Sequence, residues 1–550
     1  MARLDRLMTG KVIAQLGAAI GRQFAYDLLH TVSHLDEATL QRELKRLVDA
    51  ELVYQRGVPP QATYTFKHAL IQDAAYESLL KSTRQQYHQR IAQVLETQFP
   101  ETTETQPELL AHHYTETGVT EKAVHYWYQA GQRASERSAL VEAIAHLRQG
   151  LALLQTLPET PERPRREVDM LIALGASLRA TKGSGASETE QTYTRARQLC
   201  QHLDNPHQLF PVLRGLWHYY YIHADLRTAN ELGEQLLALA QQIQDPAMVV
   251  AAHRALGTTL KMLGAVALAH MHFTQGIALY DPQQHRASTF LYGEDAGVVC
   301  HILAASTLWL LGYPAQGRVQ LDAAVTLAQQ MAHPFSLGFA LSTAAMFHQC
   351  HREARAAQEH AEAAISLTTE QGFSYWKAHS SILRGWALAY QGEAKEGIEQ
   401  IHHGLTIYPA TGAELLQPYF LTLLAEAHGT IGELETGLTV LTEALTVVDK
   451  TGARFYEPEL YRLKGELLLQ QASANQAEAE TCFHHALEIA RNQQAKSFEL
   501  RTATSLARLW QYQGKRQEAH DLLAPVYHWF TEGCDTADLQ EAKALLDALA

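Results

Sequence analysis

The chain has 550 residues and a formal net charge of −14, with 46% hydrophobic and 19% charged residues. This composition is that of a folded protein and excludes a chain too polar to bury a core. The first hundred residues carry 12 basic and 10 acidic side chains, and the rest carry 33 and 49, so neither part has the basic excess that a nucleic-acid backbone attracts.

The cellular location is suggested by two features. The most apolar window, Val298 to Tyr313, contains His301 and is shorter than the roughly 20 apolar residues that cross a bilayer. The five cysteines form no CxxC pair, which suits a reducing compartment. We therefore expect a cytoplasmic protein that makes no membrane contact.

Residues 1–100 predict a winged-helix-like domain. Helical spacing covers Leu4–Ala19, Phe24–Val32 and Glu37–Ala50. Two β-prone runs, LVYQRG and ATYTFK, flank a Pro-Pro loop and predict a small hairpin. Such domains often bind DNA, but DEATLQRELKRLVDA, at the place of a recognition helix, has four acidic against three basic residues. The charge pattern therefore argues against nucleic-acid binding.

The segment KHALIQDAAY follows the hairpin directly. It resembles the end of the winged helix in the signal-transduction ATPases with numerous domains (STAND). In that family the motif is Met-His-Asp followed by two hydrophobic residues, and its histidine contacts the nucleotide β-phosphate in the closed state. The resemblance assigns nucleotide sensing to His68, although Lys67 and Ala69 replace the Met and Asp. The alternative is a histidine packed locally at a helix start.

Several separate strings resemble the C-terminal part of bacterial STAND or AAA-type predicted ATPases, some of which also carry a class III adenylate/guanylate cyclase domain. They are MARLDRL, AQLGAAIGR, FKHALIQDAAYESLLKSTRQQYHQRIAQVLE, AHHYTETG, YWYQAGQRA and LYDPQQHRA. No GxxxxGK[ST] phosphate-binding loop occurs in the sequence. We therefore expect no cofactor in this chain, and a nucleotide-binding domain that acts, if at all, in trans.

Residues 101–204 predict helical repeats of irregular spacing. The runs LPETPERPR and TKGSGASETE interrupt them and predict loops. Residues 205–550 repeat more evenly, because helix-starting turns recur at intervals of 40, 48, 40, 40, 40, 42 and 40 residues. The turns are marked by Ala224, Gly264, Gly312, Arg352, Gly392, Gly432, Ala474 and Gly514.

Five residues after each mark stands Ala or Gly, which lets two helices approach closely. The small-residue spacing resembles the tetratricopeptide repeat (TPR), stretched from the family's usual 34 residues to about 40. The resemblance implies an all-α protein with a TPR-like, right-handed α-solenoid. The interval of 48 residues contains Tyr280 to Gly297, which is either a tolerated loop or a site.

In the TPR family the concave groove is lined by the first helix of each repeat. The matching places hold mainly basic and aromatic residues and only one acid, Glu426, so we expect a protein or peptide partner that is acidic or bears aromatic rings. The alternative is that the rings are core and the bases solvated. These groove residues are Arg214, His218, Tyr221, Arg254, Lys261, Trp309, His379, Trp386, Tyr390, Tyr419, Lys464, Arg501, Arg508 and Tyr512.

Catalytic and metal motifs are absent from the sequence. His348, Cys350, His351 and His360 lie near one another but match no HExxH or CxxC spacing, so we expect no metal and no catalytic residue. The favoured function is a non-enzymatic scaffold or sensor of a signal-transduction ATPase system. The alternatives are a fragment of an adenylate cyclase/ATPase enzyme and a winged-helix transcription regulator.

Overall fold

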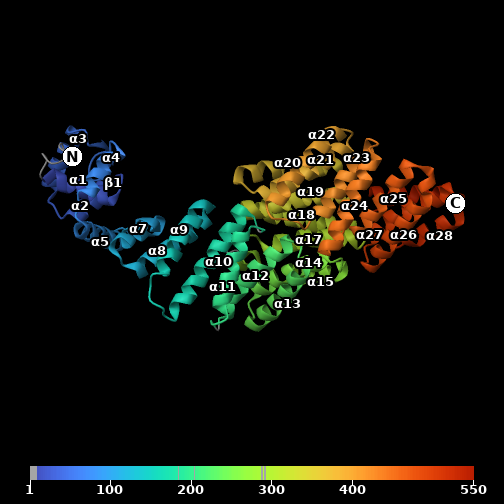
Figure 1. Ribbon diagram of the computed structural model, residues 1–550, viewed down its shortest axis with the longest axis horizontal. Helices are drawn as coiled ribbons and strands as arrows, with labels where there is room; N and C mark the ends of the chain where they lie inside the picture. The colour runs from blue at the N-terminus through green and yellow to red at the C-terminus, as the bar shows by residue number, and fades with distance from the viewer. Residues whose placement is uncertain (1–8, 184, 204, 286–288, 290–292) are drawn as a thin grey trace. The chain divides into compact units, whose positions relative to one another are not determined.

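Contacts between residues divide the chain into two compact units, Met1–Leu174 and Gly175–Ala550. The computed structural model describes residues 9–183, 185–203, 205–285, 289 and 293–550 (Figure 1). The predicted helix Leu4–Ala19 therefore lies partly outside the described residues, as does part of the stretch Tyr280 to Gly297.

The first unit begins with three helices and a small three-stranded sheet. The small sheet is antiparallel with strand order β1-β3-β2, and Tyr64 at its centre pairs with Phe24 on one side and Gln55 on the other. Residues 24 and 25, predicted as the start of the helix Phe24–Val32, instead belong to β1, a third strand that the sequence did not predict. The elements are α1 (Thr9–Ile20), β1 (Gln23–Ala25), α2 (Tyr26–Ser33), α3 (Glu37–Asp49), β2 (Val53–Arg56) and β3 (Thr63–Phe66).

Helices alone make up the rest of the first unit. The core of the sheet domain continues into them, because Ile91, Leu95, Leu110 and Tyr114 join the same buried cluster as Phe24. The unit boundary falls inside the last of these helices. They are α4 (Ala69–Glu77), α5 (Lys81–Gln98), α6 (Pro100–Thr105), α7 (Pro107–Thr117), α8 (Thr120–Glu136), α9 (Leu140–Leu154) and α10 (Glu162–Lys182).

The second unit is a TPR-like α-solenoid, as predicted, in which helix hairpins follow one another along the chain (Figure 1). It opens with α11 (Ser187–Cys200). The first helices of the pairs are α12 (Pro206–Ile222), α14 (Pro246–Met262), α17 (Ala296–Leu310), α19 (Pro334–Cys350), α21 (Ser374–Tyr390), α23 (Gln417–Thr430), α25 (Glu457–Gln471) and α27 (Lys496–Tyr512).

The second helix of each pair follows the first after a short turn and packs beside it. They are α13 (Leu226–Ile243), α15 (Val266–Leu279), α18 (Pro314–Met331), α20 (Ala354–Gln371), α22 (Ala394–Ala410), α24 (Leu434–Thr451), α26 (Gln476–Asn492) and α28 (Arg516–Tyr527). A short 3-10 turn, η2 (Ser473–Asn475), precedes α26, and α29 (Ala537–Leu549) packs against α27 and α28 at the end.

The marks that define the 40-residue period lie at the turns inside the pairs. All of them except Ala474 have a positive φ, from 58° at Ala224 to 100° at Gly392. A left-handed residue stops a helix by turning the chain, and glycine adopts that conformation at least cost. The period was therefore visible in the sequence because seven of the eight marks take this conformation.

The small residues of the period lie where paired helices touch. A Cβ atom added at Gly385 of α21 would stand 2.6 Å from the backbone oxygen of Gly397 in α22. Ala357 and Ala519, which take the place of Gly397 in other repeats, are fully buried. Larger side chains there would push the two helices apart.

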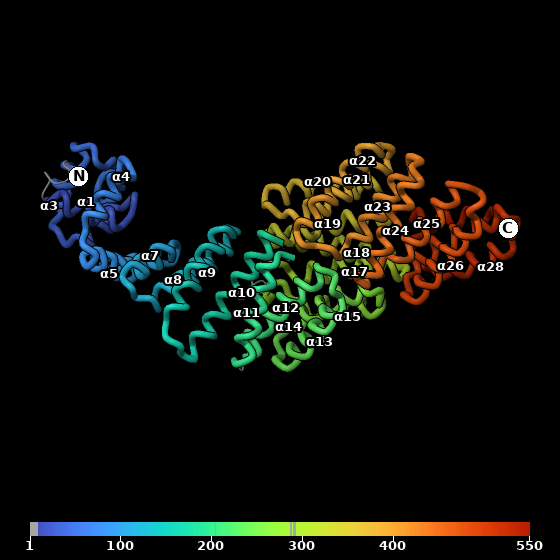
Figure 2. The backbone as a smooth tube through the Cα atoms, viewed as in Figure 1, coloured from blue at the N-terminus to red at the C-terminus, as the bar shows by residue number. Residues whose placement is uncertain are grey.

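The solenoid coils tightly enough for repeats about 190 residues apart to touch. Backbone amides of Glu414 and Arg454 donate to the carbonyl oxygens of Ile222 (3.0 Å) and Met262 (2.8 Å). One repeat farther along the chain, α17 packs beside α27 (Figure 1). Figure 2 shows the backbone of these repeats as a continuous tube. The first helices are consequently enclosed on most sides rather than facing an open groove.

Among the described residues, no helix is long and apolar enough to cross a bilayer, and this includes α17, which contains most of the apolar window from Val298.

Candidate ligand-binding cavity

The second unit encloses a cavity of about 290 Å³ near the start of the solenoid. The end of α10, the first helices α12, α14, α17, α19 and α21, and the turn after α22 line it. One part of its wall is charged, and the other is apolar and aromatic. A pocket of this size and composition suits a small ligand or the side chains of a peptide.

The charged part of the wall is built around one carboxylate. Glu294 accepts hydrogen bonds from Arg214 Nη2 at 2.5 Å and Arg254 Nη2 at 3.0 Å, and Arg179 Nη1 lies 3.6 Å away. All four side chains are at most 5% exposed. Three guanidinium groups thus surround a single acid, which leaves an excess of positive charge in this cluster.

Burial and charge compete at this cluster. Burial alone would raise the pKa of Glu294, but Arg254, Arg214 and Arg179 outweigh it and hold that pKa far below its usual range. Burial lowers the pKa of Arg254 to about 10 against the opposing pull of Glu294. Two nitrogens of Arg254, Nε and Nη1, have no hydrogen-bond acceptor among the described residues.

Lys261 adds a further cation to the three arginines and lies two helical turns beyond Arg254 on α14. It is 4% exposed and lines the cavity. No described residue accepts a hydrogen bond from its ammonium group or forms an ion pair with it. The ammonium group instead makes a cation–π contact with Phe455, whose ring centroid is 5.3 Å from Nζ. Burial lowers the pKa of Lys261 to about 8.

An unpaired buried ammonium is costly, since transfer out of water disfavours the charged form by several kcal/mol unless an anion or a hydrogen-bond network compensates. Lysines are therefore rarely buried without a partner. The arrangement is ready to receive an anion at Lys261.

Aromatic side chains of α19 and α21 form the apolar part of the wall. Phe339 and Trp376 meet edge to face with ring centroids 5.0 Å apart, and Phe335 packs against Phe373 in the same way at 5.2 Å. His379 is buried beside them, and burial lowers its pKa to about 3, so it is neutral at ordinary pH. A ligand held here would combine an anionic group with an apolar or aromatic body.

A second cavity of about 310 Å³ lies farther along the solenoid, where α29 meets the first helices. Its walls carry four arginines, and each is paired: Arg352 with Glu541 at 2.9 Å, Arg462 with Glu459 at 2.7 Å, Arg501 with Asp538 at 2.8 Å and Arg508 with Glu541 at 3.4 Å. The charges in this cavity are balanced by the protein itself.

The predicted groove residues divide among several places. The first cavity is lined by His218, Tyr221, Arg254, Lys261 and His379, and Arg214 binds its Glu294. Trp386, Arg501 and Arg508 line the second cavity instead.

The remaining groove residues are either core or surface. Trp309 is 4% exposed and packs on Phe498, and Tyr419 is fully buried with its hydroxyl donating to Gln349 Oε1 at 2.8 Å. Tyr390 and Tyr512 are exposed. Lys464 Nζ lies 3.9 Å from Glu478. The predicted set is therefore not one continuous surface.

Sequence reasoning missed several residues of the first cavity. Glu294 lies in the stretch from Tyr280 to Gly297 that interrupts the period, and Arg179 lies upstream of the regular repeats. The interruption was the available signal, since it left open a site at that place. Phe335 and Trp376 lie outside the positions that the TPR resemblance assigns to the groove.

His68 stands at the N-terminus of α4 and is exposed. Its side chain makes no cap hydrogen bond. The other noted histidines serve local contacts: His348 Nδ1 lies 2.6 Å from Glu353 Oε2, and His351 Nδ1 lies 2.9 Å from the Phe347 carbonyl oxygen.

Comparison of the sequence with known families gives no matching family model. Among curated proteins, an uncharacterized protein of Rhizobium meliloti (strain 1021) is 24% identical over 512 residues, which cover 92% of this chain and 49% of that protein. The chain thus spans about half the length of the curated relative that it matches.

Comparison with solved structures shows the fold. The Rap protein in complex with Competence and Sporulation Factor is 12% identical with a TM-score of 0.52, over 68% of this chain and 99% of that one. A STAND protein with a tetratricopeptide repeat sensor from Pyrococcus horikoshii is 11% identical with a TM-score of 0.47, over 83% and 65% of the two chains.

Proposed function

We propose that this chain is a non-enzymatic sensor whose solenoid binds a peptide or small ligand in the cavity around Lys261. In this proposal ligand occupancy is relayed to a nucleotide-binding domain through the winged-helix-like segment. That domain would belong to a partner chain or to the remainder of a longer protein. The match to half of a longer curated relative is compatible with either arrangement.

The observation that carries the proposal is the buried ammonium of Lys261, which has no acid partner among the described residues and faces an aromatic-lined cavity. Structural lysines are exposed or paired, so this one is best explained by an anion that arrives from outside. An acidic segment that also bears an aromatic ring supplies both the charge and the apolar body. The Rap protein, which shares the fold, was solved with a bound factor.

The transcription-regulator alternative receives no support from the charges of α3. Arg42 and Arg46 both pair with the buried Glu43, at 3.2 Å and 2.9 Å. Basic side chains held by an acid on their own helix attract phosphates less strongly.

The test uses N-acetyl-Glu-Phe-amide and its Gln-Phe counterpart, which differ in one charge. By isothermal titration calorimetry we expect the Glu peptide to bind wild-type protein at least about tenfold more tightly, as one charge-assisted hydrogen bond in a buried site warrants. Lys261→Met should abolish that preference, and Lys464→Met should keep it. Equal affinities for the two peptides, or equal losses in the two variants, would contradict the proposal.

We further propose that exposed His68 senses nucleotide on the partner domain. His68→Ala should leave the chain folded, because the side chain is exposed at a helix start. The variant should change the rate of nucleotide release from a reconstituted pair with the nucleotide-binding domain. An unchanged rate would remove His68 from the relay.

A further inference from the structure

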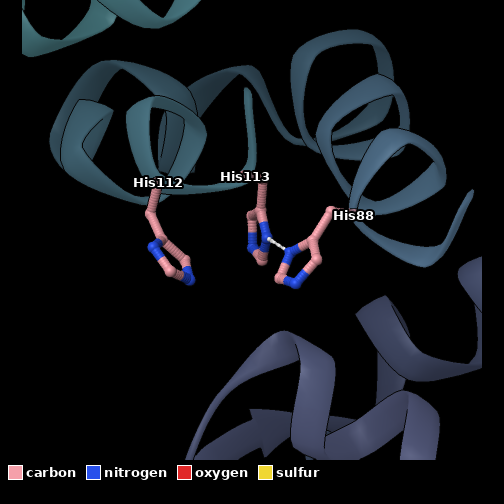
Figure 3. A group of neighbouring side chains, drawn as sticks. All are labelled: His88, His112 and His113. Atoms are coloured by element: carbon pink, nitrogen blue, oxygen red, sulfur yellow. Dashed lines mark hydrogen bonds between the residues drawn. The ribbon is translucent and has the colours of Figure 1, made fainter. Parts of the chain in front are cut away.

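Three histidines of the first unit gather between α5 and α7. His88 comes from α5, and His112 and His113 are neighbours on α7; the three rings point into the same space (Figure 3). Their ring centroids are 5.0 Å apart for His88 and His113, 5.6 Å for His88 and His112, and 5.4 Å for His112 and His113. The triangle is nearly equilateral.

This spacing is that of three imidazoles on one tetrahedral ion. A Zn–N bond is about 2.0–2.1 Å long, so three rings bound at tetrahedral angles have centroids about 5.2 Å apart and nitrogens about 3.3 Å apart. One ligand nitrogen from each ring already lies within 4.8 Å of the others. His88 Nδ1 and His113 Nδ1 are 2.7 Å apart and would separate by a few tenths of an ångström.

A second contact orients His88. Its Nε2 lies 2.9 Å from the hydroxyl of Tyr76, and that hydroxyl donates to Glu116 Oε2 at 3.4 Å. Tyr76 therefore accepts a hydrogen from Nε2, which leaves the lone pair of His88 on Nδ1, the nitrogen that faces His113. Metal-binding histidines are usually held in this way by a partner on the other ring nitrogen.

The three rings differ in exposure. His88 and His113 are each 1% exposed, whereas His112 is exposed. Two of the ligands are therefore held by the packing of α5 against α7, and the exposed His112 gives an ion access from solvent.

We propose that His88, His112 and His113 form a binding site for a divalent transition-metal cation, best fitted by Zn²⁺, with a fourth position open to water. An all-nitrogen set suits Zn²⁺ and its first-row neighbours rather than Mg²⁺ or Ca²⁺. The ion would join α5 to α7 shortly after the segment that contains His68. Sequence reasoning did not find this site, because the 23 residues between His88 and His112 match no familiar metal-motif spacing.

The test measures binding of Co²⁺ and Zn²⁺ to the full chain. We expect one equivalent of Co²⁺ to produce the intense visible absorption of a tetrahedral site, and Zn²⁺ to displace it. His112→Gln removes the exposed ligand without disturbing the core, and should weaken Co²⁺ binding at least about tenfold and weaken the tetrahedral spectrum. His125→Gln on α8, which changes another exposed histidine, should alter neither the affinity nor the spectrum.

The proposal is overturned if wild-type protein shows no tetrahedral Co²⁺ spectrum. It is overturned equally if His112→Gln binds as tightly as wild type, or if His125→Gln loses as much affinity as His112→Gln. The last result would show that metal binds at scattered surface histidines, of which the chain has many among its 29. If His88 and His113 were joined only by a hydrogen bond and bound no metal, the wild-type protein would show no tetrahedral Co²⁺ spectrum.

Discussion

The cavity around Glu294 and Lys261 and the cavity beside α29 are similar in volume, but their buried charges are paired differently. In the second cavity every arginine has an acid partner supplied by the protein, with α29 contributing Asp538 and Glu541. In the first, three arginines share Glu294, and Lys261 has no acid partner among the described residues. The protein balances the buried charges of the second cavity but not those of the first. The first cavity is therefore the place where an external anion would bind.

The difference has an energetic basis. Buried ion pairs that are well paired cost little net free energy, whereas an uncompensated buried charge is strongly unfavourable. The second cavity is therefore explained by folding alone. In the first cavity, burying uncompensated positive charge destabilises the fold, and binding of an anion would offset that loss. Such a cost is the usual sign of a functional site.

The largest expected effect comes from Glu294→Gln. It leaves Arg179 and Arg254 without a carboxylate among the described residues, and should lower the unfolding free energy by about 3–5 kcal/mol. The measurement is urea-induced unfolding followed by circular dichroism.

Asp538→Asn is the matched change in the second cavity. Arg501 keeps Glu459 at 3.6 Å and Arg352 keeps Glu541 at 2.9 Å, so the loss should be only about 1–2 kcal/mol. Equal losses in the two variants would mean that the first cluster has no special dependence on its single acid, and the contrast between the cavities would fail.

Lys261→Met should raise stability in the absence of ligand. Methionine fills nearly the same volume without a charge, so we expect the unfolding free energy to rise by about 2–3 kcal/mol. Lys464→Met, at a more exposed site, should change it by no more than about 0.5 kcal/mol. A less stable Lys261→Met protein would show that the ammonium serves the fold.

The repeat architecture was predictable from the sequence, and the site only in part. Left-handed turns and close helix contacts each demand a small residue, so Gly392 and Ala357 report the period directly. The return contact between Met262 and Arg454 depends on how repeats accumulate curvature, which no local pattern encodes. That closure buried Tyr419 and Trp309, which an open groove would have exposed.

The charge of the first cavity also depended on distant residues. Lys261 and Arg254 were predicted on the inner face, but Glu294 reaches Arg254 from a segment 40 residues away that breaks the period. Positions counted from the repeat could not include it. For the same reason the sequence suggested a continuous basic groove, whereas the structure neutralises Arg501 and Arg508 with acids of α29.

The Lys261 charge should also make the stability difference depend on pH. Its folded pKa of about 8 lies below the ordinary 10.5, so the unfolded chain binds more protons between these values, and wild-type stability rises with pH across that interval. The advantage of Lys261→Met should therefore be full at pH 7 and shrink by about 2 kcal/mol by pH 10. Urea unfolding of both proteins across this range checks it. A constant difference would place the lysine in contact with solvent or an acid.

The smallest expected effect concerns Tyr512, which was predicted to line the groove and is 76% exposed on α27. It lines neither cavity. Tyr512→Ala should change the unfolding free energy by no more than about 0.5 kcal/mol and leave the affinity for N-acetyl-Glu-Phe-amide unchanged, because a side chain in water loses few contacts on truncation. If the inner face bound an extended partner along its whole length, removing this ring would cost contact area and affinity. A tenfold weaker affinity in calorimetry would therefore show that the peptide binds along the wider groove and not in the cavity. The different charge pairing of the two cavities would then concern folding alone.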